Sequence, residues 1–86
     1  MEKADLERET KKWLKRLEDE MKGIKSTTEF ITSKKAIESV LENINAYISD
    51  CKHFLAKGDM ILAFEAVIYA WGMFDALKKC NLVQKY

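Results

Sequence analysis

The segment from Met60 to Leu77 is apolar around most of its circumference when it is drawn as a helix. The helix is expected to continue to Lys79, and its polar wedge holds Glu65, Asp75 and Lys79, with Gly72 and Ala76 among them. The remaining apolar arc spans about 220°, which is wider than the stripe of an ordinary core-facing helix. Because small domains rarely leave so much apolar surface in water, we expect neighbouring helices and a second chain to cover it.

The composition favours helices throughout. Proline is absent from the 86 residues and glycine occurs three times, so little interrupts helix formation. We therefore predict an all-α fold with a single helical domain over residues 1–86. A chain of this length buries a modest core, and such domains are commonly stabilised by a covalent staple or by oligomerisation.

Apolar residues recur at intervals of three and four along three segments. This spacing predicts helices over about 5–22, 27–57 and 59–80. Between the last two segments, Gly58 is suited to the left-handed conformation that ends a helix, and Asp59 is suited to capping the next one. The second and third helices should therefore form a tight antiparallel hairpin, within a three-helix up-down-up bundle.

The start of the second helix is open to two interpretations. Ser26 and Glu29 fit a capping box, whereas Ser33 fits a later start. We favour the earlier start, because Phe30 continues the apolar stripe of this helix. The residues that follow Asn81, a residue type that commonly ends helices, are expected to pack loosely.

The charge balance excludes a general attraction to polyanions. Fifteen basic and 14 acidic residues give a net charge of +1, so we do not expect nucleic acid or an acidic membrane surface as a partner.

The segment 60–77 approaches the length of about 20 residues that a membrane span requires, but Glu65 and Asp75 make insertion costly. Residues 1–6 are charged and lack the apolar core of a signal peptide, so we expect a cytoplasmic protein.

No group of side chains has the pattern of a catalytic, cofactor or metal site. His53 is the only histidine, and it falls on the solvent face of the second helix, whereas a general base needs a substrate pocket. Cys51 lies on the buried stripe about 20 Å along the bundle from Cys80, which excludes a disulfide within the chain. Glu65 and Asp75 lie about 15 Å apart, too far to act on one bond. We therefore predict no enzymatic activity, no cofactor and no metal.

The second half of the sequence resembles a known family. A tyrosine-containing helix over 47–57, the Gly58-Asp59 turn and a helix that reads Tyr-Ala-Trp-Gly over 69–72 are similar to the archaeal domain of unknown function 357. The resemblance covers residues 47–77 closely and the first half weakly. It implies a compact helical domain from an archaeon. It carries no established activity, so no catalytic residue can be transferred.

The turn that begins at Lys57 is also similar to turns in tetratricopeptide helix pairs and in HEPN helical domains. No second copy of a 34-residue unit is present, which excludes a tetratricopeptide array. HEPN ribonucleases place an arginine shortly before a histidine, and neither Arg8 nor Arg16 stands in that position relative to His53. The resemblance to HEPN domains therefore implies a similar shape without nuclease activity.

The leading functional hypothesis is a protein–protein interaction or homodimerisation module that uses the apolar flanks of the third helix. The sequence does not decide whether the bulky residues of these flanks are core or contact residues. They are Phe64, Val67, Trp71 and Phe74. The alternative is a nucleic-acid-associated helical domain of HEPN-like shape without nuclease activity. Its basic residues would be Lys11, Lys12, Lys15 and Arg16, whose charge is diluted by neighbouring acids.

Overall fold

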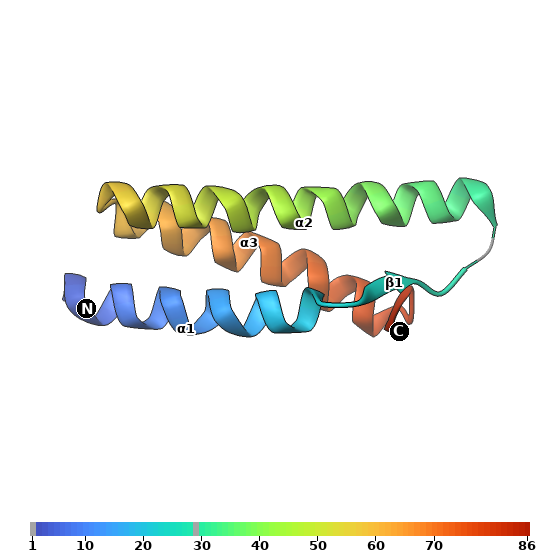
Figure 1. Cartoon of the computed structure of the whole chain (residues 1–86), viewed down its shortest axis with the longest axis horizontal. Helices are drawn as coiled ribbons and strands as arrows, with labels where there is room; N and C mark the ends of the chain where they lie inside the picture. Colours follow the sequence, from blue (N-terminus) through green and yellow to red (C-terminus); the bar gives the residue numbers. More distant parts are fainter. Residues whose placement is uncertain (1, 29) are drawn as a thin grey trace.

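The computed structural model describes residues 2–28 and 30–86, and within these residues the chain forms three helices and two short strands. The helices are α1 (Lys3–Met21), α2 (Ile31–Lys57) and α3 (Met60–Lys79). They run up, down and up along a molecule of 46 × 17 × 16 Å, and the two chain ends lie toward opposite ends of it (Figure 1). The predicted all-α three-helix bundle is confirmed.

Helices α2 and α3 form the predicted hairpin, joined by two residues. Gly58 ends α2 in the left-handed conformation with φ +80°, which a side chain would strain. The Asp59 side chain then accepts a hydrogen bond of 3.1 Å from the backbone N–H of Leu62 and so caps α3. This turn reverses the chain at once, and α3 starts beside α2 and inclines toward α1 along the bundle (Figure 1).

The core lies along the line where α3 meets α2 and α1. Leu17 from α1, Ile44 from α2, and Val67 and Phe74 from α3 are completely buried. Ala63, Ala66 and Ala70 on α3 are also buried, and their small side chains let α3 approach its neighbours closely. Thr10 is the buried polar residue of the core, and its hydroxyl donates to the carbonyl oxygen of Leu6 at 2.7 Å. The core therefore contains no polar group that lacks a partner among the described residues.

A two-stranded sheet joins the connection after α1 to the C-terminal segment. Strands β1 (Ile24–Ser26) and β2 (Val83–Lys85) pair antiparallel, with Lys25 opposite Gln84. The N–H of Thr27 continues the ladder by donating to the carbonyl oxygen of Leu82 at 2.9 Å. Val83 is buried by this arrangement and extends the core beyond the end of α3.

The sheet corrects two predictions from the sequence. The second helix begins at Ile31 and not near Ser26, because Ser26 is in β1. The Oγ of Ser26 accepts a hydrogen bond from the N–H of Thr28, while Glu29, the other residue of the expected capping box, lies outside the described residues. The C-terminal segment does not pack loosely, because β2 is tied to β1 by backbone pairing and by the burial of Val83.

Candidate functional site

One side of α3 is not covered by α1 or α2. The residues on it follow one another at spacings of three and four, as expected for a single helix face, and all of them are exposed. We call this the outer face of α3, and it consists of Ile61, Glu65, Ile68, Gly72, Ala76 and Lys79. Ile61 is 66% exposed and Ile68 is 44% exposed, so both isoleucines present their side chains to solvent.

The apolar surface continues from the outer face toward α2. Tyr69 is 64% exposed, and its ring stacks on Tyr47 of α2 with a centroid distance of 5.8 Å and an interplanar angle of 22°. Leu62 lies two turns before Tyr69 on α3 and is also exposed. The apolar side chains at the surface therefore extend from α3 to Tyr47 on α2. Groups of exposed apolar residues mark contact sites more often than single exposed residues do.

Two opposite charges stand toward the ends of the outer face. Glu65 lies one turn after the start of α3 and Lys79 is its last residue. Neither side chain takes part in an ion pair within residues 2–28 and 30–86. Midway between them is Gly72, where an added Cβ would meet nothing within 4 Å. The middle of the face is therefore open to a partner at Gly72, and the charges of Glu65 and Lys79 are available on either side of it.

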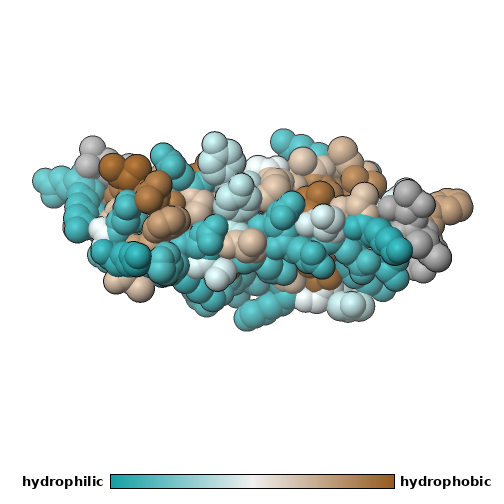
Figure 2. Space-filling model, turned by 90° about the horizontal axis from the view of Figure 1, so that it is seen from above, coloured by the Kyte–Doolittle hydropathy of each residue, from teal (hydrophilic) through white to brown (hydrophobic). Residues whose placement is uncertain are grey.

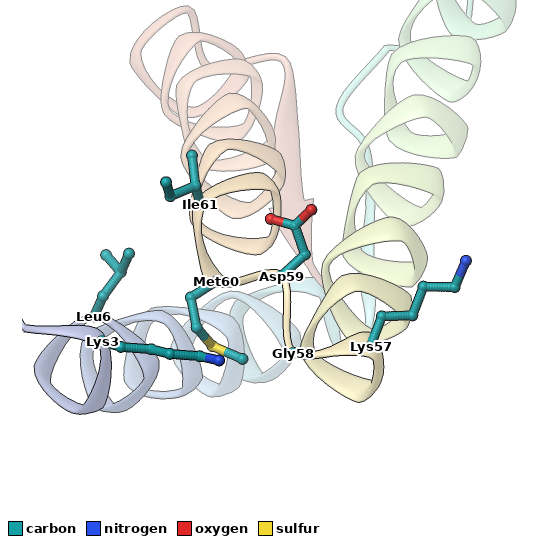
Figure 3. Close-up of a pocket in the computed structure, with 7 residues that line it drawn as sticks. All are labelled: Lys3, Leu6, Lys57, Gly58, Asp59, Met60 and Ile61. Carbon is teal, nitrogen blue, oxygen red and sulfur yellow. The ribbon is translucent and has the colours of Figure 1, made fainter.

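An open groove adjoins the outer face at the end of the bundle where α2 turns into α3. It has a volume of about 530 Å³. Figure 3 shows Lys3 and Leu6 of α1 across from Met60 and Ile61 of α3, while Lys57 points away from the bundle. Hydrophobic atoms gather at this end of the molecule and again toward the other end, with hydrophilic atoms between them (Figure 2). Ile61 belongs to both the groove and the outer face, so the two form one continuous surface.

The four core or contact candidates lie on the inner side and flanks of α3. Val67 and Phe74 are completely buried in the core, whereas Phe64 and Trp71 are partly buried. Trp71 packs against α1, where its ring meets that of Trp13. The exposed apolar residues of α3 are instead within and beside the wedge that the sequence marked as polar. The two isoleucines of the outer face were not singled out from the sequence, although both fall at the angular positions of this wedge and could have pointed to the exposed side.

The residues considered for chemistry do not form a site. His53 is exposed on α2 with its ring against Phe54. Among the described residues no group of three histidine, cysteine or acidic side chains could hold a metal ion. Cys51 is buried and Cys80 is exposed, and both thiols are free. Burial, with a smaller contribution from the nearby Glu18 carboxylate, raises the pKa of the Cys51 thiol to about 11. This thiol therefore stays protonated and is a poor nucleophile at neutral pH.

The basic residues of α1 are largely neutralised by acids on the same helix. Lys11 pairs with Glu7 at 3.5 Å, and Lys12 pairs with Glu9 at 3.0 Å. The hydrogen bond from Lys12 lowers the pKa of the exposed Glu9 carboxyl. Lys15 lies 4.0 Å from Asp19 in the same way. Arg16 has its guanidinium 4.9 Å from the ring centre of Trp13. These contacts leave α1 with a mixed surface and not with a basic stripe.

Helix α3 is long and apolar enough to cross a membrane by length and composition alone. Core helices of water-soluble bundles meet the same criterion. In this fold α3 contributes the central part of the core, with Val67 and Phe74 fully enclosed by protein. Packing therefore explains the apolar residues on the inner side of α3. It does not explain the exposed apolar residues of the outer face.

Comparison with known proteins gives a family and a fold. Residues 12–83 match the family described as protein of unknown function (DUF357). The chain is similar to the crystal structure of an Archaeoglobus fulgidus protein with the same family assignment, with a TM-score of 0.80 and 36% sequence identity. That similarity covers 98% of this chain and 97% of the other. No curated protein matches the sequence.

Proposed function

Since the chain belongs to the DUF357 family, whose function is unknown, we propose from its surface that it is a non-catalytic interaction module that forms homodimers through the outer face of α3. The observation that carries this proposal is the exposure of Ile61, Ile68 and Tyr69 on the most apolar helix of the chain. Single exposed apolar residues are ordinary, but a row of them along one helix face is typical of a contact surface.

The size of the surface indicates a weak association. A helix of 20 residues is about 30 Å long and 10 Å wide, so its face covers on the order of 300 Å². Stable interfaces bury about 800 Å² per partner, and the neighbouring Tyr47 and Leu62 would supply part of the difference. We therefore expect a weak association, with a dissociation constant in the micromolar range or above. A homodimer of this strength exchanges readily and depends on protein concentration.

The alternative, a nucleic-acid-associated domain, has less support. It would use Lys11, Lys12, Lys15 and Arg16, but the three lysines already face acids on α1. A complex with RNA or DNA would weaken steeply as salt is raised, because phosphate contacts release counterions. A homodimer held mainly by isoleucines would weaken much less steeply with salt, since apolar contacts are not screened.

Sedimentation equilibrium of the full chain between about 1 and 500 μM tests the proposal, because this range brackets the expected dissociation constant. The wild type should pass from monomer to dimer, and Ile68→Glu should stay monomeric because it introduces two charges into the contact. Ser49→Glu adds the same charge on an exposed position of α2 and should dimerise like the wild type. A wild type that is monomeric throughout, or an equal response of the two variants, would overturn the proposal.

A further inference from the structure

We propose that the two copies pack their α3 helices antiparallel, with the twofold axis at Gly72, so that Glu65 of each copy meets the partner's Lys79. This inference rests on the proposed homodimer and adds its geometry. The outer face has a symmetric layout along the helix. Glu65 stands seven residues before Gly72 and Lys79 stands seven residues after it. At 1.5 Å per residue, each charge lies about 10.5 Å from the glycine along the helix axis.

An antiparallel pair turns this layout into contacts between unlike residues. Residues equally far from Gly72 in opposite directions come to the same level on the two helices. Glu65 is then level with the partner's Lys79, and Ile68 is level with the partner's Ala76. Each copy's Ile68 therefore packs against the small Ala76 side chain of the other copy, as interdigitating helix surfaces require. A twofold contact needs such self-complementarity, because each residue pair occurs twice.

Gly72 is suited to the crossing point of the two helices. It is exposed, and the space beyond its Cα is free of other atoms within 4 Å of an added Cβ. Two glycines at the axis let the helix backbones approach closely there. The isoleucines one turn away can then reach the partner's surface. A bulky side chain at the axis would hold the helices apart at the point where the two copies of the same residue coincide.

The charges favour the antiparallel register over the parallel one. Glu65 and Lys79 have no ion-pair partner in the part of the chain that the structure describes. In an antiparallel pair each finds an opposite charge, and two equivalent ion pairs form. In a parallel pair Glu65 would face the partner's Glu65, and Lys79 the partner's Lys79. Charge pairs at the rim of an interface contribute more to choosing the orientation than to affinity.

Charge exchange between the two positions tests the register. Glu65→Lys and Lys79→Glu should each weaken self-association about tenfold or more, because each creates like-charge pairs. An equimolar mixture of the two variants should dimerise like the wild type, since the lysine introduced in one variant then meets the glutamate introduced in the other. The double variant E65K/K79E should also recover, because it exchanges both signs. Glu42→Lys, on an exposed position of α2, is the matched control and should leave self-association unchanged.

Oxidative cross-linking provides a second, independent readout in a Cys80→Ser background, which removes the exposed thiol. Gly72→Cys places the two thiols at the axis and should give a disulfide-linked dimer. Ala76→Cys places them about 12 Å apart along the helices, beyond disulfide reach, and should not cross-link. Loss of dimer in Ile68→Glu without any effect of the charge variants, or cross-linking through position 76, would overturn the register while leaving the homodimer. A monomeric wild type would overturn both.

Discussion

The indole Nε1 of Trp71 donates a hydrogen bond of 2.9 Å to the backbone carbonyl oxygen of Trp13. The two rings meet edge to face, with centroids 5.7 Å apart and an interplanar angle of 88°. A second edge-to-face contact, between Trp71 and Phe74, links this pair to the completely buried core. Trp71 therefore packs inside the chain and holds α1 against α3. The bulky flank of α3 is accordingly a packing surface within the chain.

Replacing Trp71 with phenylalanine should lower the free energy of unfolding by about 1 kcal/mol more than the same replacement of Trp13. Both changes remove an indole, but W71F also removes the hydrogen bond that Trp71 donates to the Trp13 carbonyl oxygen. Urea titrations followed by circular dichroism measure the difference. Protein at about 1 μM keeps dimerisation from contributing. If the two variants were equally stable, the hydrogen bond would have no measurable role in docking α1.

Alkylation should separate the two thiols. Cys80 is exposed and should react with iodoacetamide at pH 8, while Cys51 is buried and should react only after unfolding. Raising the pH from 8 to 10 should leave Cys51 in the folded chain nearly inert, because its pKa is raised to about 11. Mass spectrometry of native and urea-treated protein counts the adducts. Two adducts on the native chain would contradict this assignment.

The same pKa has a consequence for stability. Folding raises the pKa of the Cys51 thiol from 9.0 to about 11, so the folded state favours the protonated form. The stabilisation is complete below pH 9 and declines as pH rises toward 11, where the unfolded chain releases the proton first. The free energy of unfolding of a Cys51→Ala variant should lack this contribution to its decline between pH 9 and 11. An unchanged alkaline profile would mean that other groups account for all of it.

Truncating Val83 tests the contribution of the sheet. Val83→Ala should lower the free energy of unfolding by about 1–2 kcal/mol, because it removes buried apolar surface where β2 meets the core. Gln84→Ala, on the exposed neighbour within the same strand, should change stability by less than about 0.5 kcal/mol. Equal effects would show that β2 adds little to the folded state. Thermal and urea denaturation both report the comparison.

Alanine should act in opposite directions at two glycines. At Gly58, where φ is +80°, it should destabilise the chain by about 1–2 kcal/mol, since an L side chain strains the left-handed conformation. At Gly72, inside α3 with open space around it, alanine should stabilise the monomer by about 0.5–1 kcal/mol through its higher helix propensity. Unfolding measured at a protein concentration of about 1 μM keeps dimerisation from contributing. A stabilising effect at position 58 would contradict the described turn.

Local signals allowed the helices and their hairpin to be predicted. The spacing of apolar residues located all three helices, and the pair Gly58-Asp59 gave the turn, because its left-handed glycine and capping carboxylate act within a few residues. Asn81 also has the positive φ, 55°, of the predicted helix end. Each of these features is encoded by neighbours along the chain. That is why sequence patterns reveal them.

The missed features depend on residues far apart in the sequence. Strand β1 has three residues and exists because β2 lies beside it, so neither strand carries a recognisable pattern alone. The exposed side of α3 was equally hard to predict. A helical wheel shows how wide an apolar arc is but not which neighbour covers which part. Trp13 covers the Trp71 side, and this contact spans 58 residues of sequence.

The pairing of β1 with β2 has a kinetic consequence. Helices α2 and α3 are joined by two residues and can assemble at low entropic cost, whereas Ile24 and Lys85 must close most of the chain into a loop before they pair. We expect the hairpin to form early and the sheet to be completed late. On unfolding, the pairing of β1 with β2 should be lost first, and the amide protons of these strands should exchange with solvent well before those of α3.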